Sequence, residues 1–205
     1  MKLISLLLLA GAMVYATPMP TAKVTLANAG NPTNLIVGNI YIGPYTLTIN
    51  GQNYAAMCID YNDESWIGAS WNAYLTPVAG GDFADTYQAA NKNVAQEYGE
   101  EAYLFSQITQ PGIANQQRTD IQEAGWSITD PSYTPDAGAQ TWLQLAEADY
   151  SSMNLNGYEI VSSVNTPHQQ EFMIATPEPA SWSLLGLGLL ACAAFALYRR
   201  KRAAQ

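Results

Sequence analysis

Cys58 is the side chain in this sequence with the greatest capacity for covalent chemistry. It lies in AAMCIDYND, residues 55–63, and the only other cysteine, Cys192, lies in an apolar segment near the C-terminus. Three interpretations of Cys58 stay open on the residues alone. It is a buried and inert apolar residue, a free or intermolecular thiol, or a thiol held in a covalent bond that is not a disulfide.

An acidic cluster follows Cys58 closely and invites comparison with a Ca²⁺ site. A Ca²⁺ loop of the EF-hand type needs glycine at its sixth position and glutamate at its twelfth. Counted from the first acidic residue, these positions hold Ser65 and Trp71, so the pattern fails. We therefore expect a solvated acidic turn and no metal site, and the alternative is a Ca²⁺ site of a type other than the EF-hand. The cluster consists of Asp60, Asn62, Asp63 and Glu64.

No group of residues has the spacing of a catalytic site. His168 is the only histidine and lies in the polar stretch NTPHQQ, with no nucleophile motif near it. The sequence contains no glycine-rich phosphate loop. Three neighbouring carboxylates, Glu97, Glu100 and Glu101, are interpreted as a solvated helix face. The sequence therefore predicts no catalytic residues, no cofactor and no turnover activity.

The elements that must position Cys58 are strands. Strand signals begin at about Lys23, apolar and polar residues alternate through Tyr45–Ile49, and Asn50-Gly51 is a strong hairpin turn signal. Cys58 is therefore expected near the end of the returning strand. The strands expected with defined bounds span about 45–49, 52–59, 71–76, 158–164 and 171–176.

Between about residues 84 and 150 the apolar residues recur at helical spacing. We expect one helix through Val94–Ile108, a second from about Asn115 to the Asp130-Pro131 break, and a third from about Ala137. The predicted fold class is α+β, an antiparallel β-sheet or sandwich with a helical insertion.

Both ends of the chain carry topology signals. Residues 1–16 combine Lys2, an apolar run and a small residue at Ala16, the pattern of a signal peptide removed by signal peptidase. Near the other end, residues 182–198 carry no charge and would span roughly 25 Å as a transmembrane helix. Basic residues follow and stay on the cytoplasmic side, so residues 17–181 lie outside. They are Arg199, Arg200, Lys201 and Arg202.

The exported domain, residues 17–176, is strongly acidic. It holds three of the basic residues and sixteen of the acidic ones, a net charge of −13 with histidine neutral. Nucleic acids and anionic membranes require a basic surface. We therefore expect no nucleic-acid partner, and membrane attachment only through the C-terminal helix.

The C-terminal residues 177–205 combine Pro177-Glu178-Pro179, the apolar helix and the basic cluster in that order. This order resembles the PEP-CTERM sorting signal of Gram-negative bacteria. The resemblance implies export, at least transient residence in the inner membrane with the domain on the periplasmic side, and processing by an exosortase. The protein would then reach the cell surface or extracellular matrix. The alternative is an ordinary single-pass anchor with Pro-Glu-Pro as a linker.

A second resemblance joins Cys58 to the predicted second helix. Cys58-Ile59-Asp60 ends a strand and DIQEAGWSI, residues 120–128, lies on the helix. Over about residues 38–150 this pair resembles the thioester domains of bacterial surface adhesins. The resemblance implies an internal thioester with the sulfur from Cys58 and the acyl carbon from Gln122. The flanking residues that match are Asp60, Ala124 and Trp126.

Two positions depart from the thioester pattern. Met57 stands where an aromatic residue is usual, and Gly125 stands where a bulky apolar residue is usual. Gly125 also lowers helix stability by about 1 kcal/mol relative to alanine. The alternative is that Gln122 hydrogen-bonds within the fold and that Trp126 is a core residue.

These observations predict an exported surface or matrix protein without turnover activity. In its sharper form, the domain is a covalent adhesin in which a surface amine attacks the Gln122 carbonyl and displaces the Cys58 thiolate. The alternative is a non-catalytic module that binds polysaccharide or associates with exopolysaccharide, supported by the aromatic content of the domain.

Overall fold

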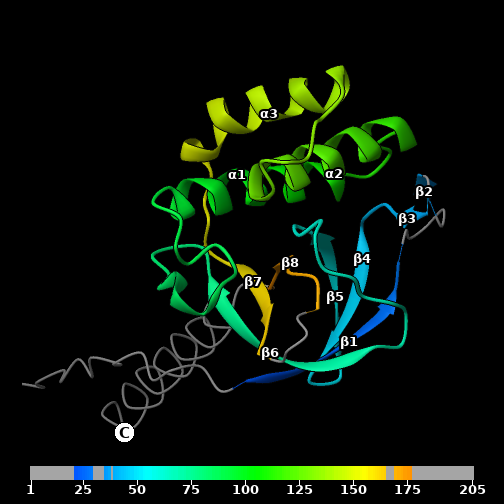
Figure 1. Cartoon of the computed structure of the whole chain (residues 1–205), viewed down its shortest axis with the longest axis vertical. Coiled ribbons are helices and arrows are strands. Elements are labelled where there is room, and N and C mark those ends of the chain that lie inside the picture. Colours follow the sequence, from blue (N-terminus) through cyan, green and yellow to red (C-terminus); the bar gives the residue numbers. More distant parts are fainter. Residues whose placement is uncertain (1–20, 30–34, 38, 165–168, 177–205) are drawn as a thin grey trace, which may run out of the picture.

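Six antiparallel strands close into a barrel, and three helices pack together on one side of it (Figure 1). This computed structural model describes residues 21–29, 35–37, 39–164 and 169–176. The barrel order is β1-β4-β5-β8-β7-β6, and β2 pairs only with β3. The strands are β1 Ala22–Asn28, β2 Ile36–Val37, β3 Ile40–Tyr41, β4 Tyr45–Ile49, β5 Gln52–Cys58, β6 Ser70–Pro77, β7 Tyr158–Ser163 and β8 Phe172–Ala175.

The α+β class and the antiparallel sheet with a helical insertion are confirmed. The sheet is a closed six-stranded barrel and not a sandwich. β1 is hydrogen-bonded to both β4 and β6, so Val24 pairs with Ile49 on one side and Trp71 on the other. The register of β1 against β4 shifts between Leu26 and Asn28, and such a bulge bends a strand. Local alternation indicates which face of a strand is buried, but it does not indicate which distant strand pairs with it.

The hairpin that carries Cys58 forms at the predicted turn. Asn50 and Gly51 have φ values of 49° and 86°, as a two-residue type I′ turn requires. Ile49 therefore pairs with Gln52, and the register runs on along β5. The last residues of β5, from Ala56 to Cys58, pair with β8, and Cys58 lies opposite Phe172.

The three helices follow the predicted bounds closely and lie in the chain between β6 and β7. The second helix ends where Asp130 precedes Pro131, which disfavours helical backbone. The third begins with a side-chain cap, since Asp136 accepts a hydrogen bond from the Ala139 N–H at 2.8 Å. The helices are α1 Val94–Ile108, α2 Asn115–Thr129 and α3 Ala137–Asp149, with short 3₁₀ turns η1 Phe83–Asp85 and η2 Tyr150–Ser152.

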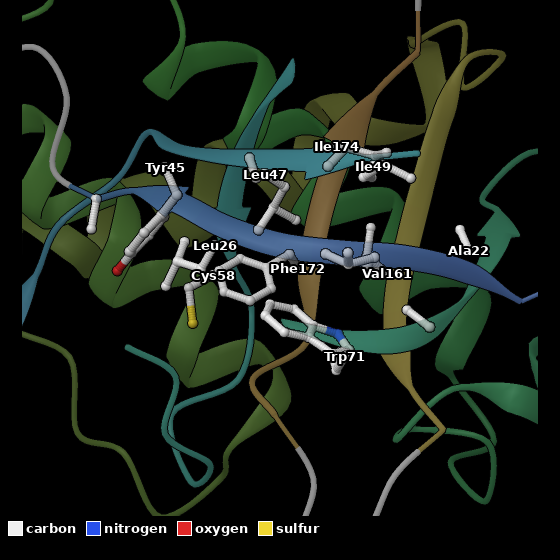
Figure 2. Close-up of a cluster of buried hydrophobic side chains, with 14 of the residues drawn as sticks. Ala22, Leu26, Tyr45, Leu47, Ile49, Cys58, Trp71, Val161, Phe172 and Ile174 are labelled. Atoms are coloured by element: carbon white, nitrogen blue, oxygen red, sulfur yellow. The ribbon is translucent and has the colours of Figure 1, made fainter. Parts of the chain in front are cut away.

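Side chains alternate between two hydrophobic cores along β5. Ala56 and Cys58 point into the barrel interior, where Figure 2 shows the thiol near Leu26 and Phe172. Met57, between them, belongs to the second core, which lies between the barrel and the helices. The strand end at Cys58 is thus enclosed by the barrel on one side and by the helices on the other.

Candidate functional site

Cys58 is fully buried at the last position of β5. Its Sγ donates a hydrogen bond to the backbone oxygen of Asp60 at 3.0 Å. Burial raises the pKa of the thiol to about 12, and the carboxyls of Asp60 and Glu101 act in the same direction, against hydrogen bonds that lower it. At neutral pH the thiol is therefore protonated and a poor nucleophile on its own.

Gln122 is also fully buried and reaches Cys58 from helix α2. Its Nε2 donates to the backbone oxygen of Cys58 at 2.5 Å, across 64 residues of sequence. Its Oε1 accepts from the backbone N–H of Gly43 at 3.3 Å. These two hydrogen bonds hold the Gln122 carboxamide beside the Cys58 backbone and fix its orientation.

Gly43 is a residue that sequence reasoning missed. A Cβ at this position would lie 3.0 Å from Gln122 Oε1 and 3.3 Å from Ile108 Cδ1. The bare backbone therefore lets its N–H approach the carboxamide oxygen, where it would stabilise negative charge on that oxygen during acyl transfer. The only local signal was the Gly43-Pro44 dipeptide, which indicates a turn and no partner.

Trp126, four residues after Gln122, closes the site with two tyrosines. Trp126 is 3% exposed, and its indole lies beside the Cys58 thiol. Its ring centroid lies 5.3 Å from that of Tyr61 and 5.7 Å from that of Tyr133, and the two tyrosines are 4.7 Å apart. We call these three residues the aromatic cover. Trp126 is the ring next to the thiol, whereas Tyr61 is 40% exposed.

The other two flanking residues lie close by and have structural contacts. The Asp60 Oδ1 accepts from the N–H groups of Asn62 at 2.9 Å and Asp63 at 3.4 Å, which orders the turn after β5. Ala124 is fully buried in the core between barrel and helices. Among the described residues, no three His, Cys, Asp or Glu side chains come together as a metal site.

The carboxylates of α1 are not a solvated face, so that interpretation is wrong. Glu101 is fully buried and Glu100 is 9% exposed, because α1 packs its acidic turn against α2 and α3. Burial raises the pKa of both carboxyls. The helical period was recognised in the sequence, but no local signal says that a face containing two glutamates is covered by other helices.

A cavity of about 610 Å³ opens beside the aromatic cover. Trp126 and Tyr61 form part of its wall, and Asp63 and Glu64 add carboxylates to it. Trp66, also in the wall, is 64% exposed. The cavity thus offers aromatic faces and negative charge next to the buried pair.

The C-terminal sequence matches a known protein-sorting motif. Residues 175–201 match the PEP-CTERM protein-sorting motif. A PEP-CTERM protein is typically exported, processed by an exosortase and anchored at the cell surface. The match supports the sorting signal, and it says nothing about a thioester or adhesion. Comparison with curated proteins and with solved structures gave no match.

Several predicted features lie outside the described residues. These are the signal peptide 1–16, His168, Cys192, the membrane helix 182–198, the sorting residues Pro177, Glu178 and Pro179, and the basic cluster 199–202. Within the described part of the chain, no helix has the length and apolar character that crossing a membrane requires.

Proposed function

We propose that this protein is an exported surface or matrix protein whose domain forms a covalent link through an internal thioester between Cys58 and Gln122. The observation that supports the proposal most is the hydrogen bond from the Gln122 carboxamide to the Cys58 backbone, between two fully buried residues. They come from a strand and a helix 64 residues apart, as the resemblance implies.

The proposed bond forms without an external reactant. The Cys58 sulfur attacks the Gln122 carboxamide carbon, the S–C bond forms, the C–N bond breaks, and ammonia leaves with the thiol proton. The N–H of Gly43, which already contacts Gln122 Oε1, is placed to stabilise the developing oxyanion. Full burial of both residues would then slow hydrolysis of the product.

In the second step a primary amine on a partner attacks the thioester carbonyl. The C–N bond forms, the C–S bond breaks, and the proton released by the amine returns to sulfur as the Cys58 thiol. The product is an amide between Gln122 and the partner. The chain reacts once and is not regenerated, so this is covalent attachment and not turnover.

Intact mass tests the proposal. We expect the purified chain to weigh one ammonia less than its processed sequence, and to gain one methylamine when that amine is added. Cys58→Ser and Gln122→Ala should each abolish both changes. A wild-type chain of unmodified mass, with Cys58 freely alkylated under native conditions, would reject the thioester.

A second candidate is polysaccharide binding at the cavity. It is favoured by one observation, the 64% exposed Trp66 beside Tyr61 in a wall that also carries carboxylates. Aromatic faces stack on sugar rings, and carboxylates accept hydrogen bonds from the sugar hydroxyls. Binding of polysaccharide from the producing organism should then survive Cys58→Ser and be lost in Trp66→Ala. If Trp66→Ala binds the polysaccharide as well as Cys58→Ser does, the cavity is not the binding site.

A further inference from the structure

Glu101 is a buried carboxyl with no visible structural role. It lies in the middle of α1, it is fully buried, and neither carboxyl oxygen has a hydrogen-bond partner among the described residues. Its neighbour Glu100, by contrast, accepts a hydrogen bond from Gln96 at 2.8 Å. A buried carboxylate without a partner destabilises a fold, so the presence of Glu101 requires another explanation.

Glu101 points at the helix face that carries Gln122. A Cβ on Gly125 would lie 2.8 Å from Glu101 Oε2, so the carboxyl occupies the space that a side chain at 125 would fill. Gly125 follows Gln122 by three residues, which places the two on the same face of α2, one turn apart. A glycine at position 125 therefore leaves the space that the buried Glu101 carboxyl occupies.

The charge state of Glu101 suits proton transfer. Burial raises its pKa well above the ordinary value, and the carboxyls of Glu100, Glu171 and Glu97 act in the same direction. The raised pKa favours the neutral acid, which has one O–H donor and a carbonyl oxygen that accepts. In its charged form the same carboxyl raises the pKa of the Cys58 thiol, so the two groups lie near each other.

Thioester formation needs such a group. The thiol is protonated at neutral pH, and an amide nitrogen leaves only when it gains a proton, so one proton must move from sulfur to nitrogen. An acid that donates from one oxygen and accepts at the other carries this proton without changing its own state.

We propose that Glu101 is the proton-transfer group for thioester formation between Cys58 and Gln122. Its O–H gives a proton to the departing nitrogen and its carbonyl oxygen takes the proton of the thiol. The S–C bond forms, the C–N bond breaks, ammonia leaves, and Glu101 ends as it began. This inference rests on the proposed thioester.

The test follows thioester formation in the full chain, refolded in detergent from denaturant, by intact mass against time. Glu101→Gln keeps the shape and removes the acid, and we expect it to slow the loss of ammonia by about 10²-fold. Glu101→Asp is a worse fit but keeps the acid, so it should form the bond faster than Glu101→Gln. A packing role would give the reverse order. Glu159→Gln changes a half-buried carboxyl on β7 whose pKa is raised by burial alone, so it is the matched control and should form the bond at the wild-type rate.

A second variant keeps the test decisive if Glu101→Gln does not fold. Gly125→Ala strengthens the helix and places a methyl group against Glu101 Oε2, so it should displace the carboxyl and slow formation in a folded chain. If the wild type loses ammonia and both Glu101→Gln and Gly125→Ala do so at the same rate, the role of Glu101 is overturned and the thioester stands. If the wild type never loses ammonia, both proposals fall.

Discussion

The side chain of Gln122 is held by backbone groups of two strand segments. It donates to the carbonyl of Cys58 at the end of β5 and accepts from Gly43 just before β4. A carboxamide that is satisfied at both atoms keeps one orientation, since a flipped amide would lose both hydrogen bonds. The orientation of the Gln122 carboxamide therefore depends on the barrel as much as on α2.

Gly43 should tolerate no side chain. Gly43→Ala places a methyl group 3.0 Å from Gln122 Oε1, and we expect it to lower the free energy of unfolding by about 1–3 kcal/mol, as overpacking does. Chemical denaturation measures this loss. In a Gln122→Ala background the same substitution should cost less, because the clash is gone. Equal losses in the two backgrounds would show that Gln122 and Gly43 do not interact.

The sequence predicted Cys58, Gln122 and Trp126 because short motifs carry them, but it did not predict Gly43 or Glu101. Gly43 acts through its backbone, which has no residue-type signature. Glu101 was assigned to solvent because glutamate on a helix is usually exposed. Only tertiary packing of α1 on α2 buries it, and the pattern of a single helix does not contain that information.

Between elements, the aromatic cover joins the turn after β5 to α2 and to the loop before α3. Tyr61, Trp126 and Tyr133 come from these three segments and contact one another at centroid distances of 4.7 to 5.7 Å. Of the three, Trp126 packs in the same core cluster as Cys58. If the proposed bond forms, we expect these side chains to slow the access of water to it.

Removing one ring of the cover should shorten the lifetime of the thioester. Tyr133→Ala opens a path to the buried pair, so we expect the thioester form to hydrolyse faster, gaining the mass of one water and leaving a carboxylic acid at position 122 and a free Cys58 thiol. Tyr74→Ala, a partly buried tyrosine on β6, is the control and should leave the lifetime unchanged. A lifetime unaffected by Tyr133→Ala would show that shielding comes from burial in the barrel alone.

A second link between elements is the buried Glu171, at the start of β8. It accepts hydrogen bonds from the Tyr98 hydroxyl on α1 at 2.8 Å, from the Tyr87 N–H at 3.0 Å and from the Ser162 hydroxyl on β7. Burial nevertheless raises the pKa of this carboxyl to about 7. The group that fastens α1 to the barrel therefore changes charge near neutral pH.

This shift makes the fold less stable as the pH rises. An unfolded glutamate has a pKa near 4.3, so the folded chain binds the extra proton between about pH 4.3 and 7, and the stabilisation is lost as the pH passes through that window. The free energy of unfolding, measured with urea, should be about 3 kcal/mol higher at pH 5 than at pH 8 because of Glu171. Glu171→Gln should remove that part of the difference. An identical pH dependence in this variant would assign it to other carboxyls such as Glu101.

At the scale of the whole molecule, the exported domain expected from the sequence is strongly acidic. Residues 17–176 carry sixteen acidic and three basic residues, and the cavity beside the aromatic cover contributes Asp63 and Glu64. Such a field concentrates cations and repels anions before contact. An amine presented beside basic residues should therefore reach the proposed bond faster than one beside acidic residues.

Coupling rates should show this selection. A lysine peptide flanked by arginines should couple faster than one flanked by glutamates, and salt should reduce the difference. Asp63→Asn with Glu64→Gln should narrow the gap further. Asp82→Asn with Asp85→Asn changes the net charge equally at η1 and is the control. If both pairs act alike, the general field selects the partner and the cavity does not.

Element types and bounds could be predicted well from the sequence, because Asn50-Gly51, Asp130-Pro131 and the helical periods are local signals. The closure of the barrel could not be predicted. It depends on β1 pairing with β6 and on β8 entering between β5 and β7, over separations that no local pattern encodes. The meeting of β5 and α2 was predictable only through the resemblance that joins their motifs.

The position of β8 has a mechanical consequence. The matched sorting motif begins at residue 175, the last residue of that strand. Tension on the C-terminus therefore acts along a strand that is hydrogen-bonded on both sides, to β5 and to β7. All of these bonds must shear together before the strand leaves, and Cys58, paired with Phe172, lies at the first residue pair of that junction. A partner joined at Gln122 would then be attached to a barrel that resists force applied at its C-terminus.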